Sequence, residues 1–170
     1  MLSRLQDSDL RFVAELPNHA AVIDRICAEA FGPGRFVRAA ERVREAAPHD
    51  PRLSLVAVLN DEVVGSVRQT RCAIGTTPVV MLGPLAVRPA FKRRGIGRTL
   101  LAMAAEVAAE AGERAIFLVG DRAYYTPFGY RPLPVGSVRM PGPVDETRIL
   151  GLELVEGSLD GVGGMVGPRH

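Results

Sequence analysis

The segment that most constrains this chain is Met81–Leu101, which reads MLGPLAVRPAFKRRGIGRTLL. It begins as an apolar strand, is interrupted by Gly83-Pro84, and ends in basic residues followed by Gly95 and Gly97 at the start of a helical pattern. The free N–H groups and the positive dipole end of a helix start favour an anion, and glycine lets a phosphate approach them closely. We therefore expect a site for a ligand that carries a pyrophosphate.

Pro84 predicts an irregular sheet just before this site. Proline has no N–H, so a regular ladder of hydrogen bonds cannot run through it, and a bulge or splay is expected at Gly83-Pro84. The backbone of Leu85–Val87 would then be available to an extended ligand. If the apolar strand predicted at 115–119 runs parallel to this one and diverges from it, the two form a V-shaped slot. Such a slot suits a long, amide-bearing chain that ends in a pyrophosphate.

Two common phosphate-binding motifs are absent from the sequence. The dinucleotide fingerprint needs a third glycine, but position 100 is leucine, and no acidic residue ends a following strand at the expected spacing. A Walker A loop needs Gly-Lys-Ser/Thr, which does not occur. A bare Gly-x-Gly before a helix is also ordinary turn chemistry, so the glycines alone leave both interpretations open.

The rest of the chain predicts one α/β domain, since 170 residues suffice for a single core. Apolar periodicity, glycine and proline predict strands at 10–16, 53–59, 63–72, 79–87, 115–119, 128–132 and 149–154, and helices at 17–31, 35–47, 95–111 and 120–127. The three strands within 53–87 form an antiparallel meander. The domain is expected to span 1–157, with a loose leader at 1–8, and the glycine-rich tail at 158–170 is expected to fray.

Composition argues against several classes of protein. A net charge of +2 is too small to indicate nucleic-acid binding, and no apolar run reaches the length of a membrane span. Cys27 and Cys72 lack the spacing of a metal site or a disulfide framework, and both fall on apolar patterns where burial is expected. A reduced, cytoplasmic setting is the expectation. His19, His49 and His170 show no mutual spacing for a metal or for catalysis, so no metal is expected.

The sequence LAVRPAFKRRGIGRTLL resembles the acyl-CoA-binding motif of the GCN5-related N-acetyltransferase (GNAT) superfamily. The family pattern is Leu-x-Val, a proline and Gln/Arg-x-x-Gly-x-Gly/Ala before a helix. This chain departs from the pattern at Lys92, which supplies a donor and a charge but not a bidentate fork. The order of elements over 9–155 is also similar, and the segments FGPGRF, LGPLAV and GDRAYYTPFGYRPLP resemble a bacterial subgroup of poorly defined substrate. The matching positions are Leu85, Val87, Pro89, Arg94, Gly95 and Gly97.

The resemblance implies a fold and a set of contacts to acetyl-CoA. The fold is a mixed, mostly antiparallel sheet of six to seven strands, with flanking helices and a V-shaped splay between the two central parallel strands. The backbone of Leu85, Ala86 and Val87 would pair with the pantetheine arm. The pyrophosphate would lie on the backbone amides of residues 93–97, with basic and polar side chains beside it. The residues of this phosphate site are Lys92, Arg93, Arg94, Gly95, Ile96, Gly97, Arg98 and Thr99.

The resemblance also implies catalytic roles. Tyr125, four residues before Gly129, would act as general acid to the departing CoA thiolate, and the alternative is that Tyr124 and Tyr125 are packed aromatics. The N–H of Leu85 would stabilise the oxyanion. The base that deprotonates the amine stays open, since each candidate is also an ordinary surface charge. The candidate bases are Glu29, Glu62 and Asp121.

These features predict direct transfer of an acetyl group from acetyl-CoA to the amine of a small molecule or a protein. Arg35 and Phe36 of the FGPGRF loop could contact that acceptor, although helix-stop chemistry explains the glycines without it. The rival hypothesis is a non-catalytic acyl-CoA-binding or sensing module, which needs the phosphate site but not Tyr125. Nucleic-acid binding ranks last, and no membrane contact is expected. Homodimers are common in the resembled family, but the sequence marks no interface.

Overall fold

The structure of the chain is a computed structural model that describes residues 9–170, without the side chains of residues 36 and 37. The leader predicted at 1–8 lies outside the described residues. The strands are β1 Leu10–Ala14, β2 Leu55–Leu59, β3 Glu62–Ile74, β4 Thr77–Val87, β5 Ala115–Val119, β6 Arg131–Pro132, β7 Val138–Arg139, β8 Ile149–Glu153 and β9 Gly164–Gly167. The α-helices are α2 Ala20–Phe31, α3 Ala39–Ala46, α4 Ile96–Glu110 and α5 Arg122–Tyr125. Short 3-10 helices are η1 Pro17–His19, η2 Pro33–Val37, η3 Pro51–Leu53, η4 Pro89–Phe91, η5 Thr126–Phe128 and η6 Glu146–Arg148.

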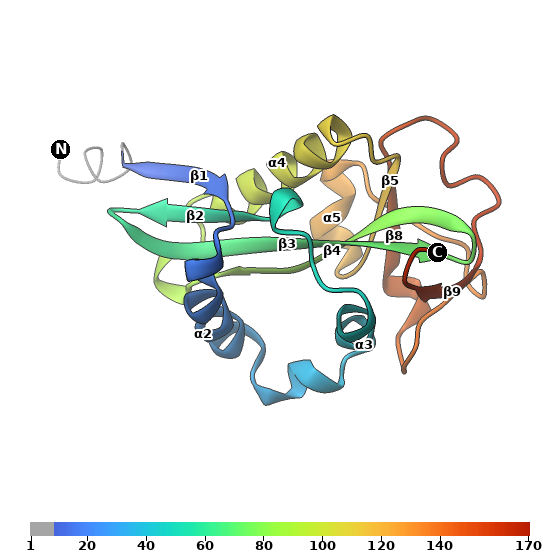
Figure 1. Cartoon of the computed structure of the whole chain (residues 1–170), viewed down its shortest axis with the longest axis horizontal. Helices are drawn as coiled ribbons and strands as arrows, with labels where there is room; N and C mark the ends of the chain where they lie inside the picture. Colours follow the sequence, from blue (N-terminus) through green and yellow to red (C-terminus); the bar gives the residue numbers. More distant parts are fainter. Residues whose placement is uncertain (1–8) are drawn as a thin grey trace.

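The strands form one sheet whose main path runs β1-β2-β3-β4-β5-β8-β6. Neighbours on this path pair antiparallel, except β4 and β5, which pair parallel. Figure 1 shows α4 and α5 on one side of the sheet and α2 and α3 on the other. The predicted fold, a mostly antiparallel sheet with one central parallel pair and flanking helices, is confirmed.

Turn chemistry sets the meander β2–β3–β4. Asn60 and Asp61 adopt left-handed φ angles of 51° and 63°, which short polar side chains tolerate and which close the β2–β3 hairpin. Gly75, with φ 58°, begins the turn from β3 into β4. The meander therefore places β4 in the centre of the sheet, with its carboxyl end leading into η4 and α4.

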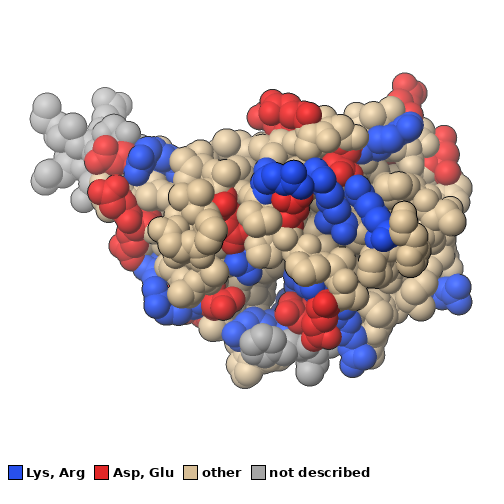
Figure 2. All heavy atoms as spheres, in the orientation of Figure 1, with Lys and Arg blue, Asp and Glu red and all other residues tan. Residues whose placement is uncertain are grey.

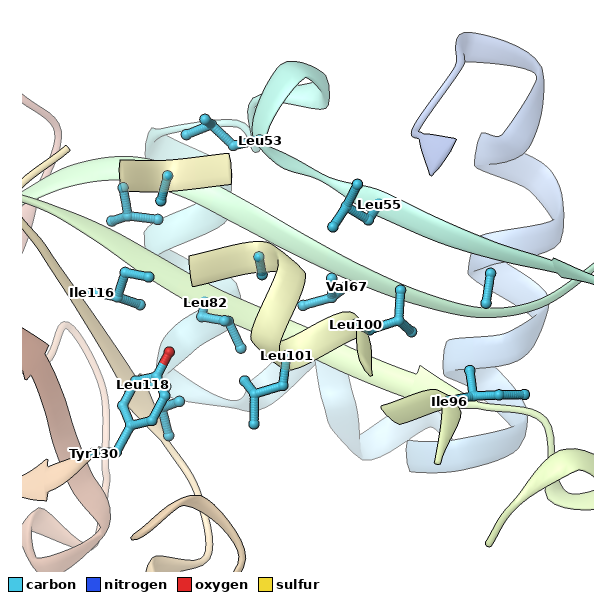
Figure 3. Close-up of a cluster of buried hydrophobic side chains, with 14 of the residues drawn as sticks. Leu53, Leu55, Val67, Leu82, Ile96, Leu100, Leu101, Ile116, Leu118 and Tyr130 are labelled. Carbon is cyan, nitrogen blue, oxygen red and sulfur yellow. The ribbon is translucent and has the colours of Figure 1, made fainter. Parts of the chain in front are cut away.

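The main core lies between α4 and the sheet, where Figure 3 shows its side chains converging. The periodicity of the sequence predicts a buried stripe that includes Met103, Val107 and Ala111. Met103 and Val107 are only partly buried, and Ala111 is exposed beyond the end of the helix. The stripe is rotated toward the small residues, because alanines let the helix approach the sheet closely. The buried residues of α4 are Ile96, Leu100, Leu101, Ala104 and Ala108.

The edge of β4 is free along its second half, as Pro84 predicts. β4 pairs with β5 at Val80–Ile116 and Met81–Phe117, and within the described residues no pairing of these two strands follows. On the other side of β4, the register against β3 shifts at Gly83-Pro84. The predicted bulge and splay are both present. Beyond Met81, β4 thus has one partner, β3, and one free edge.

The prediction that residues 158–170 fray is wrong. β9 pairs with β3 at Ala73–Gly167 and Ile74–Val166, and also runs parallel to β7. Val166 is only 3% exposed. The tail therefore belongs to the sheet, and neither β9 nor β7 is among the predicted strands. The sequence gives no sign of β9 because the strand is rich in glycine. Gly164 lies against neighbouring backbone and not against apolar side chains, so the apolar alternation expected of a strand is missing.

Two helices differ from their predicted form. The stripe of α2 consists of Ile23, Ile26 and Cys27, whereas Ala21 and Ala30, which periodicity also favours, are exposed. The helix predicted at 35–47 is divided, because η2 is a 3-10 helix and α3 begins only at Ala39. No helix among residues 9–170 is long and apolar enough to cross a membrane.

Candidate active site

A cavity of about 1090 Å³ opens where β4 and β5 diverge. One wall is the free edge of β4 from Leu82 to Val87, and the others are the start of α4, helix α5, and segments of α2 and α3. The cavity therefore connects the two faces of the sheet through the gap between the strands. Figure 2 shows the surface hollowed below the sheet, with basic and acidic side chains mixed around the hollow. Its size suits a large, elongated ligand.

The end of the cavity at α4 is suited to an anion. Arg93 and Gly95 adopt left-handed φ angles of 66° and 80°, so the chain turns sharply before the helix. Within the described residues, the backbone N–H groups of 93–97 donate to no protein acceptor. Lys92 and Arg98 line the same end, and the helix dipole adds a partial positive charge. Backbone donors and basic side chains thus converge here.

Most of the residues predicted to contact acetyl-CoA line this cavity, but Arg94 and Thr99 do not. The Arg94 guanidinium carbon lies 5.3 Å from the ring centre of Phe91, and Thr99 Oγ1 donates to the Gly95 carbonyl at 3.0 Å. These two side chains stabilise the loop and the helix start. Those that line the cavity are Leu85, Ala86, Val87, Lys92, Arg93, Gly95, Ile96, Gly97 and Arg98.

Both tyrosines of α5 line the cavity, in different positions. The Tyr124 hydroxyl lies over the first turn of α4, since a Cβ added to Gly97 would lie 3.0 Å from it. The half-buried ring of Tyr125 packs beside Gly120. It also makes edge contacts with Tyr124 and Tyr130, with ring centres 4.9 and 5.8 Å apart. Tyr125 is thus the more firmly packed of the pair.

Burial raises the pKa of Tyr125 to about 12, and the neighbouring Tyr124 adds to the shift. The phenol therefore stays protonated across the working range of most enzymes and is available as a proton donor. Asp121 fixes the start of α5, since its Oδ1 accepts from the Ala123 N–H at 3.0 Å. The site thus offers a positioned, protonated hydroxyl.

The three carboxylates considered as bases lie in different places. Asp121 lines the cavity, but it is engaged in capping α5. Glu62 forms an ion pair with Arg88 at the β2–β3 hairpin. Glu29 is exposed on α2, and neither it nor Glu62 lines the cavity. The structure therefore brings only one of the three predicted candidates to the site.

The predicted acceptor loop also reaches the cavity. Gly32, with φ 69°, ends α2, and Arg35 lines the cavity while its Nη1 donates to the Gly32 carbonyl at 2.7 Å. The side chain of Phe36 lies outside the described part.

Cys27 and Cys72 are buried as predicted, and burial raises the pKa of both thiols, that of Cys72 to about 12. Neither thiol is set up as a nucleophile.

One cluster is missed by the sequence analysis. The Glu15 side chain, 4% exposed, lies with its Oε2 2.6 Å from Nε2 of His49. Its Oε1 accepts from Nε and Nη2 of Arg68 at 2.9 and 2.7 Å. His49 and Arg68 line the cavity on the side of α2 and α3. The partners are 34 and 53 positions from Glu15, so only the folded sheet brings them together. The one sequence signal is an acidic residue within the strand predicted at 10–16.

The parallel pair that splays, the free strand edge and the glycine-bordered helix start occur together in this structure. The model of the acetyltransferase (GNAT) family matches residues 21–130 of this chain. The chain belongs to the acetyltransferase (GNAT) family. The predicted family and enzyme class are thus confirmed, and the match spans most of the elements that line the cavity, although the lining residues between Pro143 and Arg148 lie beyond it.

Relatives of this GNAT chain agree with the assignment. It is 27% identical over 157 residues to the Escherichia coli N-acetyltransferase YhbS, covering 89% of this chain and 92% of that protein. It is 28% identical over 128 residues to the E. coli N-acetyltransferase YjhQ, covering 73% and 70%. Among solved structures, YhbS in complex with CoA superposes with a TM-score of 0.77 at 26% identity, covering 95% and 90%. A Brucella melitensis GNAT acetyltransferase in complex with acetyl-CoA gives 0.61 at 26% identity, covering 89% and 98%.

Proposed function

We propose that this protein transfers the acetyl group of acetyl-CoA directly to an amine, with both substrates bound in the cavity at once. The observation that carries the proposal is the free edge of β4. It begins where pairing with β5 stops at Met81–Phe117 and runs to Val87, close to the unpaired amides before α4. An extended amide chain can pair with the edge while its phosphates reach the amides.

Two similar structures support acetyl-CoA as the donor. The YhbS structure was solved with CoA and the B. melitensis structure with acetyl-CoA, and both resemble this chain over most of its length. We assign the pantetheine arm to Leu85–Val87 and the pyrophosphate to the amides of 93–97. Lys92 and Arg98 would neutralise phosphate charge at the same end.

The chemistry needs an oxyanion donor and an acid for the thiolate. The Leu85 N–H would stabilise the carbonyl oxygen as the amine attacks, because charge develops on that oxygen. Tyr125 would protonate the departing thiolate, and its raised pKa keeps the proton available until that step. No protein thiol needs to carry the acetyl group, since Cys27 and Cys72 are buried and weakly acidic. Their free, unpaired state fits the reduced, cytoplasmic setting that we propose for the protein.

Initial-rate kinetics test this function. Acetyl-CoA would be varied at several fixed concentrations of an amine selected from a panel of an α-amino acid, a polyamine, an aminoglycoside and a lysine-containing peptide. Direct transfer predicts double-reciprocal lines that intersect. Parallel lines would indicate an acetyl-enzyme intermediate and contradict the proposal. Tight acetyl-CoA binding without turnover of any panel amine would favour the rival hypothesis, a non-catalytic acyl-CoA-binding or sensing module.

A further inference from the structure

The structure assigns a proton acceptor for the amine: His49, whose ring is positioned by Glu15. This inference rests on the proposed acetyl transfer and supplies the base that the sequence leaves open. A protonated amine has no lone pair, so a group in the cavity must take a proton before attack. None of Glu29, Glu62 and Asp121 is both free and in the cavity.

The bonds of Glu15 fix the tautomer of the His49 ring. Burial alone would raise the pKa of Glu15, but hydrogen bonds from His49 and Arg68, and the positive charge of Arg68, lower it below its ordinary value. Glu15 is therefore a carboxylate that only accepts, so Nε2 of His49 carries the hydrogen across the 2.6 Å contact. In the neutral ring the lone pair is then on Nδ1. Among the described residues, no group forms a hydrogen bond with Nδ1.

The position of His49 relative to β4 suits this role. The N–H of Asp50, the next residue, donates to the Gln69 carbonyl at 2.8 Å, which holds the loop on β3. Gln69 pairs with Leu82, and Val67 pairs with Leu85. His49 therefore lies along β3 at the level of the bulge in β4, with β3 between its backbone and β4, and it lines the same cavity as Leu85. That bulge directly precedes the proposed oxyanion donor, the Leu85 N–H.

The loop that carries His49 is rigid at both ends. Before it, the Ala47 N–H donates to the Val43 carbonyl at 2.9 Å and ends α3. After it, Ser54 Oγ donates to the Asp50 carbonyl at 2.8 Å, and the Asp50 carboxylate caps η3, accepting from the backbone N–H and from Nη2 of Arg52 at 2.9 Å each. The imidazole is thus held by its backbone as well as by Glu15. Such fixed orientation is what a general base needs.

Other charged groups of the cavity are less suitable. Glu41 is paired with Arg44 at 2.9 Å, and Asp145 caps the Thr147 N–H at 3.0 Å. Asp24 lines the cavity from α2, but a carboxylate is a weaker proton acceptor than imidazole near neutral pH. The groups that set the charge around His49 are therefore Glu15, which pairs with its ring, and Arg68, which shares that carboxylate.

The proposed step balances as follows. Nδ1 of His49 takes one proton from the ammonium, and the freed lone pair attacks the thioester carbonyl, so that a C–N bond forms. Collapse of the oxyanion breaks the C–S bond and releases the thiolate, which takes a proton from Tyr125. The second proton of the amine nitrogen leaves as the amide forms and restores the phenol through solvent. His49 returns its proton to solvent, and the products are the acetamide and CoA.

Replacement of His49 by Gln tests the role. Gln keeps an N–H donor for Glu15 but has no proton-accepting nitrogen, so a merely structural role would be preserved. For the panel amine with the highest turnover, we expect His49→Gln and His49→Ala to lower kcat by about 100-fold or more. Calorimetry should show unchanged acetyl-CoA affinity in both. His170→Gln, far along the chain, is the matched control.

Several outcomes would overturn the assignment. If His49→Gln keeps a kcat close to that of the wild type, His49 has only a structural role and is not the base. Loss of turnover in Asp24→Asn, with His49→Gln active, would move the role to Asp24. If the wild type binds acetyl-CoA but acetylates no panel amine, the proposed acetyl transfer is contradicted, and the role of His49 in that reaction is contradicted with it. By contrast, turnover that does not depend on His49 would leave the proposed function intact and overturn only the inference.

Discussion

A Cβ atom on Gly97 would lie 3.0 Å from the hydroxyl oxygen of Tyr124, so helix α5 closes over the first turn of α4. The contact joins the proposed phosphate site to the segment that carries the proposed acid. It also explains why glycine suits this position, since a side chain would meet Tyr124 and cover the unpaired amides. Helix α5 and the start of α4 therefore meet at this close approach.

Gly97→Glu should abolish acetyl-CoA binding. The new side chain would occupy the space below Tyr124 and place a negative charge where the phosphates are expected. We expect the dissociation constant measured by calorimetry to rise by about 100-fold or more, equivalent to about 3 kcal/mol. The fold should persist, because glutamate is a better helix former than glycine.

Ala102→Glu is the matched control for this prediction. Ala102 is exposed on the same helix, so the variant adds the same charge away from the cavity. Its acetyl-CoA affinity should equal that of the wild type, and both variants should keep the wild-type circular dichroism spectrum. If Gly97→Glu binds acetyl-CoA as well as Ala102→Glu does, the phosphates lie elsewhere.

Tyr125→Phe should lower kcat by about 100-fold while leaving acetyl-CoA affinity unchanged, because only the proton donor is removed. Since burial raises the pKa of Tyr125 to about 12, loss of its proton should not limit the rate at ordinary alkaline pH. Tyr124→Phe is the control, since Tyr124 lies over α4 and should mainly affect binding. A larger kcat loss in Tyr124→Phe would transfer the acid role to Tyr124.

Glu15 should make stability depend on acid pH. Its pKa in the folded protein is below the ordinary value of 4.5, so its contribution is complete above that pH and is lost as the pH falls through the folded pKa. Glu15→Gln would leave the Arg68 charge without a carboxylate and should lower the free energy of unfolding by about 3 kcal/mol at pH 7. Urea unfolding at pH 7 and pH 3.5 should show that difference shrink in acid. A difference that stays constant would contradict the lowered pKa.

Arg169→Ala should destabilise the protein through the C-terminal segment. The guanidinium donates to the carbonyls of Cys72 and Val79 at 2.9 and 2.8 Å, and to Glu113 at 2.6 Å. We expect thermal or urea unfolding to report a loss of about 2 kcal/mol, typical of hydrogen bonds to a charged group. Arg114→Ala, an exposed arginine beside Glu113, should have little effect. Equal stability of the two variants would mean that the hydrogen bonds of the Arg169 side chain add nothing to the stability of the fold.

Much of the fold is predictable because it depends on local chemistry. Pro84 removes a donor from β4, and the bulge and free edge follow from that one residue. Asn60 and Asp61 adopt the left-handed turn that closes the predicted hairpin. Gly95 and Gly97, at the start of α4, mark the anion end because glycine lets a phosphate approach the backbone N–H groups closely. In each case the deciding interaction lies within a few residues along the chain.

The parts that sequence analysis misses depend on contacts between distant residues. β9 is glycine-rich and has no apolar alternation, so its pairing with β3 leaves no periodic signal. His49 has no metal or catalytic spacing, and its role emerges only when Glu15 and Arg68 meet it across the sheet. The choice between Tyr124 and Tyr125 likewise depends on which hydroxyl faces the reacting sulfur. Such relationships are properties of the folded chain.

The most direct test of the central claim is calorimetric titration of acetyl-CoA into the purified wild-type protein, with CoA and ATP as reference ligands. The account predicts one binding site of micromolar affinity for acetyl-CoA, similar binding of CoA, and much weaker binding of ATP, which lacks the pantetheine arm that pairs with Leu85–Val87. Absence of acetyl-CoA binding, or equal affinity for ATP, would contradict the assignment of the β4–β5 slot as an acetyl-CoA site.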